Sequence, residues 1–224
     1  MEKCKRIQIR LPEAIIQQIQ SFLSEEEAAR TTLISKSWYN AWQTRPVLVL
    51  RNLDWRSSAA EFSEFAVKTM RRLIVDAMKL GATDLNLEFK PTTFVLPAEV
   101  LGSESLLRLS VFGCEIDGNF KCSMLKSLSL DLVLLKSDDM LGIITSCCKS
   151  IEELSLSNSK ASLSNPRRTL SSMNLHELHK LKRLYLEELN VDYCFFYDLL
   201  ESRFPCLDDM SLVGCFFWLN GMKP

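Results

Sequence analysis

The stretch LPEAIIQQIQSFLSEEEAARTTLISKSWYNAWQTRP, residues 11–46, predicts three short helices and decides the fold of the N-terminal part. The first helix runs from Leu11 to Leu23, and Pro12 suits its first turn, where a missing N–H costs nothing. At about 100° per residue, its large apolar side chains fall within an arc of about 140°. They are Leu11, Ile15, Ile16, Ile19, Phe22 and Leu23. Such a helix must bury one broad side.

Two further helices follow in the same stretch. Ser24 and Glu27 have the spacing of a capping box, which predicts the start of the second helix. The third helix is expected over residues 35–44, with Trp38 and Trp42 four apart and therefore on one face. Three helices in fewer than about 40 residues make a very small core, which is marginal on its own. We therefore expect part of the apolar surface to be shared with another molecule.

These residues carry a resemblance to a known family. The matching features are Leu11-Pro12, the Ile/Phe/Leu face of the first helix, Leu33, Ser35-Lys36-x-Trp38, Trp42 and Pro46, in order and at family spacing. The stretch resembles an F-box, most closely the plant type that precedes leucine-rich repeats, and the resemblance covers about residues 8–50. One departure is Glu13, because many members have Asp after Leu-Pro. This departure weakens the argument for an N-terminal cap and leaves the apolar face unchanged.

A different spacing takes over from about residue 80, with the frame L-x-x-L-x-L-x-x followed by Cys, Asn or Leu. The second anchor of each copy is Leu85, Leu109, Leu128, Leu154, Leu184 or Met210. The steps between anchors average about 25 residues, within the ~20–29 of leucine-rich repeats. Each copy predicts a short strand, and stacked copies form a parallel sheet with the returning segments outside. The alternative is a set of unrelated buried strands, which six copies of one frame disfavour.

The residues between the anchors of each strand are expected to face the other side of the sheet. They are Ser110, Ser129, Ser155, Tyr185 and Ser211. Helical spacing marks two of the returning segments, 138–148 and 195–204. An amphipathic helix is also expected from Ala60 to Leu80, with Gly81 as its C-cap, and it is predicted to cap the first repeat.

The fold class predicted from both halves is α/β. It comprises an N-terminal three-helix F-box followed by a short, irregular leucine-rich-repeat solenoid, with parallel strands and helical or loop returns. The expected domains are a tail at 1–7, the F-box at 8–50, a linker and capping helix at 51–80, and repeats at 81–224. The repeats are expected to hold about six strands, with a C-terminal cap that is absent or truncated.

Composition excludes several classes of function for the 224-residue chain. Its formal net charge of -1 gives no general electrostatic reason to bind DNA, RNA or an anionic membrane. It has no apolar run of 18 or more residues, so no membrane span is predicted. None of its eight cysteines forms a Cys-x-x-Cys pair, which favours a reducing intracellular compartment, nucleus or cytoplasm.

Candidates for catalysis or metal binding are few. The two histidines, His176 and His179, could form a pair of metal ligands or a solvated pair, and no third ligand is placed beside them by the sequence. Phosphate-binding glycine loops and a nucleophile elbow are absent from the sequence. We therefore predict no catalytic, cofactor-binding or metal site, and no enzyme activity.

The resemblance implies the substrate-recognition subunit of a Skp–cullin–F-box ubiquitin ligase. The F-box would bind a Skp-type adaptor, and through it the cullin and RING proteins, while the repeats hold an unknown target protein for ubiquitination and proteasomal degradation. The implied adaptor-binding residues are Leu11, Pro12, Ile15, Ile16, Ile19, Leu23, Leu33, Ser35 and Lys36. Phe22, Trp38 and Trp42 are expected in the F-box core. The alternative is a non-degradative regulator or scaffold that binds the adaptor without presenting a substrate.

Overall fold

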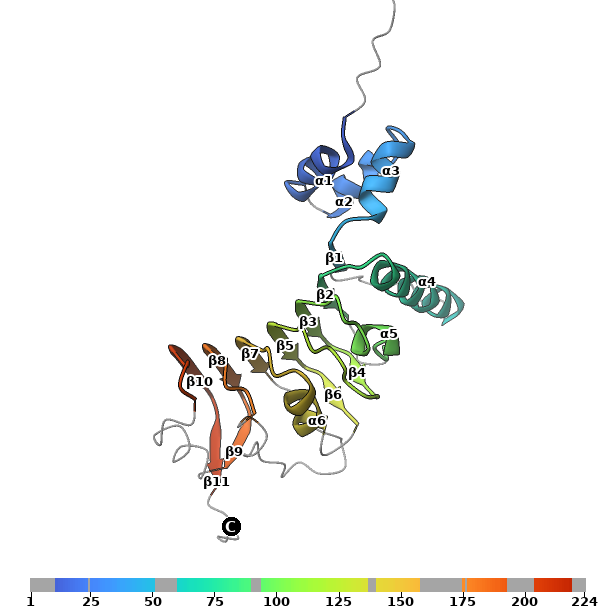
Figure 1. Ribbon diagram of the computed structural model, residues 1–224. Coiled ribbons are helices and arrows are strands. Elements are labelled where there is room, and N and C mark those ends of the chain that lie inside the picture. Colours follow the sequence, from blue (N-terminus) through green and yellow to red (C-terminus); the bar gives the residue numbers. More distant parts are fainter. Residues whose placement is uncertain are drawn as a thin grey trace, which may run out of the picture. The chain divides into compact units, whose positions relative to one another are not determined.

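The computed structural model describes residues 11–23, 25–50, 60–89, 94–136, 140–157, 175, 177–192 and 204–218. The chain divides into two compact units, Met1–Arg45 and Pro46–Pro224, which are drawn in Figure 1. Several predicted features lie outside the described residues. They are the N-terminal tail, Ser24 of the capping box, residues 51–59 of the linker, His176, and the helix predicted at 195–204 apart from Phe204.

The first unit holds the three predicted helices, α1 (Glu13–Ser21), α2 (Glu25–Thr31) and α3 (Lys36–Gln43). Pro12 is the N-cap of α1 and makes no side-chain capping bond. Glu13 instead accepts a hydrogen bond from Thr44 Oγ1 at the end of α3, so its longer side chain ties the two helices together. Ser35 caps α3 by accepting a hydrogen bond from the Trp38 backbone N–H.

The second unit is built on a parallel sheet that confirms the predicted repeat. In spatial order its strands are β1 (Val47–Leu50), β2 (Asp84–Glu88), β3 (Arg108–Phe112), β5 (Ser127–Asp131), β7 (Glu153–Ser157), β8 (Arg183–Glu187) and β10 (Asp209–Val213). The six predicted anchors, from Leu85 to Met210, pair with one another in continuous register. Residues at equivalent positions of successive sequence repeats are therefore paired across neighbouring strands of the sheet.

Strand β1 differs from the expected domain boundary. Residues 47–50 were assigned to the F-box by the resemblance, whereas they pair with β2 and place Leu48 beside Leu85. The physical reason is their Val-Leu-Val-Leu sequence, which consists of residues that favour strands, and Leu48 and Leu50 pack against the core of the second unit. The helical unit consequently ends at Arg45.

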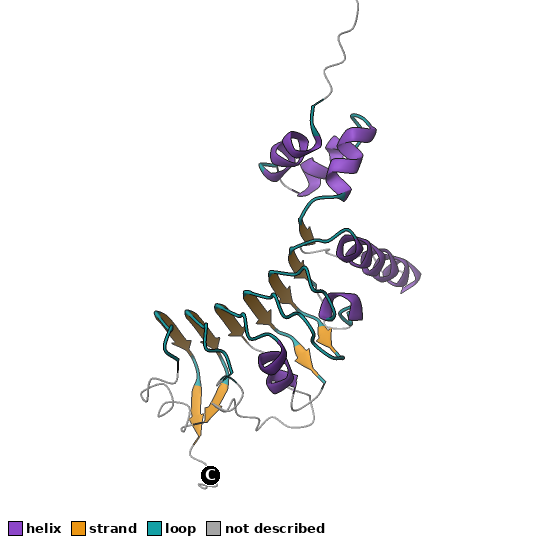
Figure 2. Cartoon of the chain, in the orientation of Figure 1, coloured by secondary structure: helices purple, strands orange, loops and turns teal. Residues whose placement is uncertain are grey.

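Helices cover one face of this sheet (Figures 1 and 2). They are α4 (Ala60–Lys79), α5 (Ala98–Leu101) and α6 (Met140–Cys147). Residues such as Ile74, Val100 and Ile144 from these helices join the leucine anchors in one core. Short parallel pairs, β4 (Glu115–Ile116) with β6 (Leu134–Leu135) and β9 (Asn190–Asp192) with β11 (Phe216–Trp218), follow the main strands.

Helix α4 ends as the sequence predicts. Gly81 has φ of 80°, the Gly81 N–H donates to Met78 O at 3.1 Å, and the Ala82 N–H donates to Ala77 O at 3.0 Å. This pair of bonds is the Schellman motif, which satisfies the last carbonyls of the helix. It directs the chain into β2, the first of the predicted strands.

Candidate functional site

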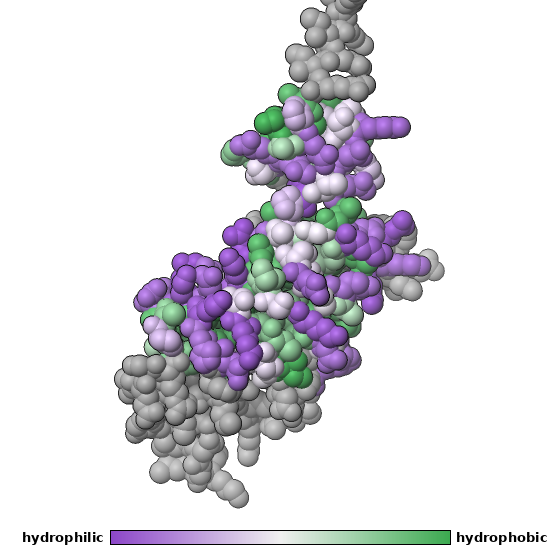
Figure 3. Space-filling view, viewed as in Figure 1, coloured by the Kyte–Doolittle hydropathy of each residue, from purple (hydrophilic) through white to green (hydrophobic). Residues whose placement is uncertain are grey.

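A stripe of exposed apolar side chains runs along α1. Ile15, Ile19 and Phe22 are 43%, 36% and 81% exposed, and at about 100° per residue they lie within an arc of about 60°. Leu11, just before the helix, is 38% exposed. Figure 3 shows hydrophobic side chains at the surface over this helix. A contiguous exposed apolar surface on a small unit marks a contact with another molecule.

The opposite side of α1 holds the helical unit together. Ile16 and Gln20, one turn apart, are 1% and 0% exposed. Gln20 Nε2 donates hydrogen bonds to Thr31 Oγ1 at 2.8 Å and to Trp38 O at 3.2 Å. A single buried amide thus joins all three helices. Because Gln20 is polar, the sequence does not suggest that it is buried. Its position four residues after the apolar Ile16 is the one sequence feature that indicates burial.

Two expectations for α1 require correction. Ile16 was predicted to bind the adaptor, whereas it is buried in the unit because its helical phase points inward. Phe22 was predicted in the core, whereas it is largely exposed. Phe22 is the C-cap residue of α1 and lies on the same side as Ile15 and Ile19. Phe22 therefore belongs to the exposed stripe.

The remaining predicted residues surround the α2–α3 turn and the ends of the helices. Leu33 in the turn is 88% exposed, Pro12, Ser35 and Lys36 are exposed as well, and Leu23 is half-buried. Trp38 and Trp42 are half-buried on α3. The guanidinium carbon of Arg45 lies 5.4 Å from the centre of the Trp42 ring, a cation–π contact that covers the end of the unit.

The sheet of the second unit has a second candidate surface, on the face opposite to α4, α5 and α6. We call it the open face, and its side chains form three rows across the strands. The first row is Asp84, Arg108, Ser127, Glu153 and Arg183; the middle row is Asn86, Ser110, Ser129, Ser155 and Tyr185; the last row is Glu88, Phe112, Asp131, Ser157 and Glu187. The middle row contains four of the five side chains predicted to face away from the anchors, and the fifth, Ser211 on β10, pairs with Tyr185.

The first and last rows differ in their charged side chains, because the first row contains both signs of charge and the last row only carboxylates. In the first row, Arg108 pairs with Asp84, and Arg183 pairs with Glu153. The last row contains three carboxylates and no cation. Among the described residues, Glu187 Oε2 accepts hydrogen bonds from Ser157 Oγ at 2.9 Å and from Tyr185 Oη at 3.0 Å. The bond to Glu187 raises the pKa of the Tyr185 phenol above its ordinary value.

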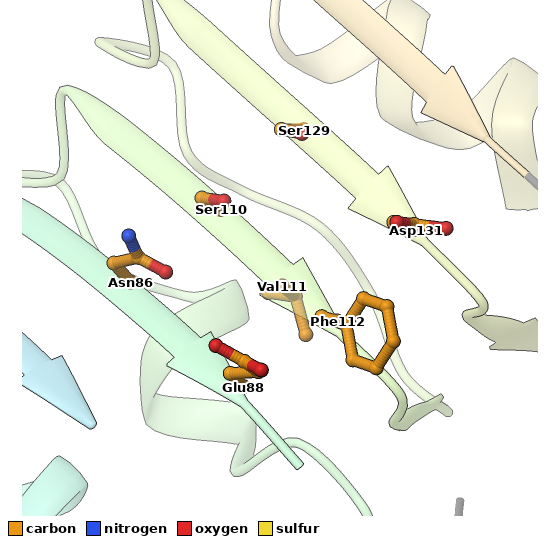
Figure 4. Close-up of a pocket in the computed structure, with 7 residues that line it drawn as sticks. All are labelled: Asn86, Glu88, Ser110, Val111, Phe112, Ser129 and Asp131. Atoms are coloured by element: carbon orange, nitrogen blue, oxygen red, sulfur yellow. The ribbon is translucent and has the colours of Figure 1, made fainter. Parts of the chain in front are cut away.

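A hollow of about 390 Å³ lies on the open face, over β2, β3 and β5 (Figure 4). Its lining residues are Asn86, Glu88, Ser110, Val111, Phe112, Ser129 and Asp131. The ring of Phe112 lies between the carboxylates of Glu88 and Asp131, and the hydroxyl groups of Ser110 and Ser129 lie nearer the starts of their strands. Asp131 Oδ1 is buried and has no hydrogen-bond partner in the part of the chain that the structure describes.

No arrangement for metal binding is present among the described residues, because no group of three His, Cys, Asp or Glu side chains comes together there. His179 is exposed, and His176 lies outside those residues. Burial raises the pKa of the Cys114 and Cys148 thiols to about 12, so they are poor nucleophiles. No helix in the described ranges has the length and apolar character to span a membrane.

Several known proteins with similar sequences come from Arabidopsis thaliana, while no protein-family model matches the chain. One F-box/LRR-repeat protein is 30% identical over 221 residues, covering 91% of this chain and 50% of the relative. A second F-box/LRR-repeat protein is 28% identical over 91% of this chain and 76% of its own length. An F-box protein is 23% identical over 91% of this chain and 57% of its own length. The chain thus spans about half the length of two of these relatives.

Proposed function

We propose a function from the premise that this chain belongs to the plant family of F-box proteins with leucine-rich repeats. The chain binds a Skp-type adaptor through its helical unit and a target protein through its repeats. Through the adaptor it joins a cullin and a RING protein, and it promotes ubiquitination and degradation of the target. The protein itself is the non-catalytic substrate-recognition subunit.

The observation that carries the proposal is the exposed stripe formed by Ile15, Ile19 and Phe22. Burying a large apolar side chain contributes about 1.5–3 kcal/mol, and these three lie together on α1. Leu11 extends the stripe, and Leu33 adds a very exposed side chain in the α2–α3 turn. A partner with an apolar groove would complete this small unit.

The contribution of the protein to ubiquitin transfer is proximity. A target held on the repeats and a transfer enzyme held through the adaptor meet at an effective concentration set by the assembly, without a new catalytic group.

The test of adaptor binding is the double variant Ile15→Asp/Ile19→Asp in the full chain. Placing two carboxylates in an apolar contact is expected to weaken capture of a purified Skp-type adaptor at least about 100-fold. The matched control is Ala14→Asp/Gln18→Asp, which puts the same two charges on exposed positions of the same helix. Circular dichroism shows whether both variants keep their helices. Equal capture by all three proteins would exclude α1 as the docking helix.

A reconstituted ubiquitination assay distinguishes the substrate receptor from the regulator. For a receptor, proteins captured with the full chain are ubiquitinated by the cullin complex, and Ile15→Asp/Ile19→Asp removes this activity. Adaptor capture without cullin-dependent modification of any captured protein would instead support the non-degradative regulator.

A further inference from the structure

The chemistry of the open face identifies the class of target segment that it accepts, provided that the repeats hold the target as proposed above. We infer that the last row, with the hollow between Glu88 and Asp131 at its centre, binds a basic segment of the target protein. One arginine or lysine side chain lies over Phe112 between the two carboxylates. Further cations of the same segment lie along the row toward Glu187.

The hollow has the groups that a cation requires. Glu88 and Asp131 supply acceptor oxygens on opposite sides of the Phe112 ring (Figure 4). An arginine or lysine over an aromatic face is attracted by the ring quadrupole, and a guanidinium can donate to a carboxylate through two N–H groups. The neutral Asn86, Ser110 and Ser129 add hydrogen-bond donors and acceptors without adding positive charge.

The charges of the hollow are also not compensated by any cation among its described lining residues. Its seven lining residues include two carboxylates and no lysine or arginine. The arginines of the first row, Arg108 and Arg183, are already paired with Asp84 and Glu153. Asp131 Oδ1 in addition lacks a hydrogen-bond partner among the described residues.

The register sets the spacing of the expected cations. Phe112 separates Glu88 from Asp131, and Ser157 separates Asp131 from Glu187, so a carboxylate occurs on every second strand. Neighbouring strands lie about 4.8 Å apart, which places successive carboxylates about 10 Å apart. A polyproline II segment rises about 3.1 Å per residue with three residues per turn. Every third residue of such a segment therefore faces the row at nearly the same spacing.

The test uses labelled peptides with the full chain and measures fluorescence anisotropy at low salt. The probe has seven residues, with arginine at its first, fourth and seventh positions and proline between them. One control peptide has the same composition with the arginines consecutive, and another has glutamate in place of arginine. We expect the spaced arginine peptide to bind several-fold more tightly than the consecutive one, and the glutamate peptide not to bind.

The matched variants distinguish peptide binding at the hollow from nonspecific electrostatic attraction to the protein surface. Glu88→Gln/Asp131→Asn removes two charges from the hollow and is expected to weaken the spaced peptide at least tenfold. Glu99→Gln/Glu104→Gln removes two charges from exposed positions on a returning segment and is expected to change binding less than twofold. Phe112→Leu keeps an apolar side chain without the ring, and about a threefold loss is expected.

The proposal is overturned if both double variants weaken binding equally, if the glutamate peptide binds as well as the arginine peptide, or if no peptide binds. Thermal denaturation of each variant shows whether the fold persists. The variant Ile15→Asp/Ile19→Asp should bind the peptide like the unmodified chain. Failure of adaptor capture would therefore count against the proposed function. The peptide measurements would still test binding at the open face independently.

Discussion

Single cysteine residues in the second unit differ sharply in their surroundings. Cys114, Cys122 and Cys148 are buried, whereas Cys147 and Cys206 are exposed. Cys122 Sγ donates to the carbonyl oxygens of Val100 and Leu101, both at 3.2 Å. Because a thiolate is poorly solvated in such an environment, burial raises the pKa of Cys148 to about 12. The buried thiols act as small apolar side chains that pack neighbouring repeats.

Alkylation at pH 8 should therefore be selective. At this pH only about one Cys148 thiol in 10⁴ is ionised, so iodoacetamide is expected to modify Cys147 and Cys206 and to leave Cys114 and Cys148 unmodified, as measured by peptide mass spectrometry. The raised pKa also gives the sign of the pH dependence. The stabilising effect of these neutral thiols is complete below about pH 8.5 and declines as pH rises toward 12.

The control for this prediction is alkylation in denaturant, which should modify all the cysteines at similar rates. Modification of Cys148 in the folded chain as fast as that of Cys147 would show that the thiol is accessible, contrary to its burial. A uniform rate among the cysteines would contradict the packing described for this part of the sheet.

The helical spacing of the apolar residues predicted most of the exposed stripe on α1. It did not predict correctly which side chain is exposed or buried at every position. Ile15 and Ile19 were expected on the outer surface and are exposed, but Ile16 was assigned to the same surface and is buried. Gln20 is polar yet buried, and its hydrogen-bond partners Thr31 and Trp38 come from other helices. A hydrogen bond between segments distant in sequence leaves no periodic signal in either segment.

The turns that end the strands share a backbone feature across the repeats. The fourth residue after the anchor has positive φ after β3, β5, β8 and β10, with φ of 71°, 50°, 51° and 60° at Gly113, Leu132, Glu188 and Gly214. Leu132 and Glu188 thus adopt a left-handed backbone conformation, which is unfavourable for residues that have a side chain. The two glycines differ in their surroundings. A Cβ added at Gly113 would lie 2.2 Å from Phe89 O, whereas one at Gly214 would lie 3.5 Å from Glu188 Cγ.

Alanine substitution at these two glycines should consequently have unequal costs. Gly214→Ala is expected to lower the free energy of unfolding by about 1–2 kcal/mol, the cost of a side chain in the left-handed region. Gly113→Ala carries the same cost together with a backbone clash, so a loss of at least about 3 kcal/mol is expected. Urea unfolding of the second unit measures both. Equal losses would mean that the Phe89 carbonyl moves aside freely.

Six strands of the main sheet could be predicted because their anchors repeat every second residue within one frame, and because stacking places the anchors in register. They are β2, β3, β5, β7, β8 and β10. The frame did not reveal β1, since the position three residues before Leu48 holds Arg45 and not an apolar anchor. The acidic last row could not be predicted from the sequence either. Glu88, Asp131 and Glu187 are distant in sequence, and only the sheet brings them into one row.

At the scale of the whole molecule, the boundary between the units lies between Arg45 and Pro46. The Thr83 N–H donates to Pro46 O at 2.8 Å, so residues directly after the boundary already belong to the sheet. Leu48 and Leu50 pack against its core. The predicted limit at residue 50 would have cut this strand from the unit that it completes.

Two shortened chains test the boundary. A chain of residues 46–224 retains β1 and is expected to unfold cooperatively, whereas a chain of residues 51–224 loses the packing of Leu48 and Leu50 and should melt several degrees lower. Hydrogen exchange of the β2 amides should also be faster in the shorter chain. Identical melting temperatures would show that β1 contributes nothing to the stability of the sheet.

The continuous register of the leucine anchors has an evolutionary consequence. Spacings between successive anchors range from 19 to 30 residues, yet all six anchors align across the sheet. Insertions in the returning segments are therefore absorbed without displacing the strands. If the open face binds the target as we infer, exchanging Phe112 or Asp131 for another side chain would change the segment that is bound while the leucine framework stays the same.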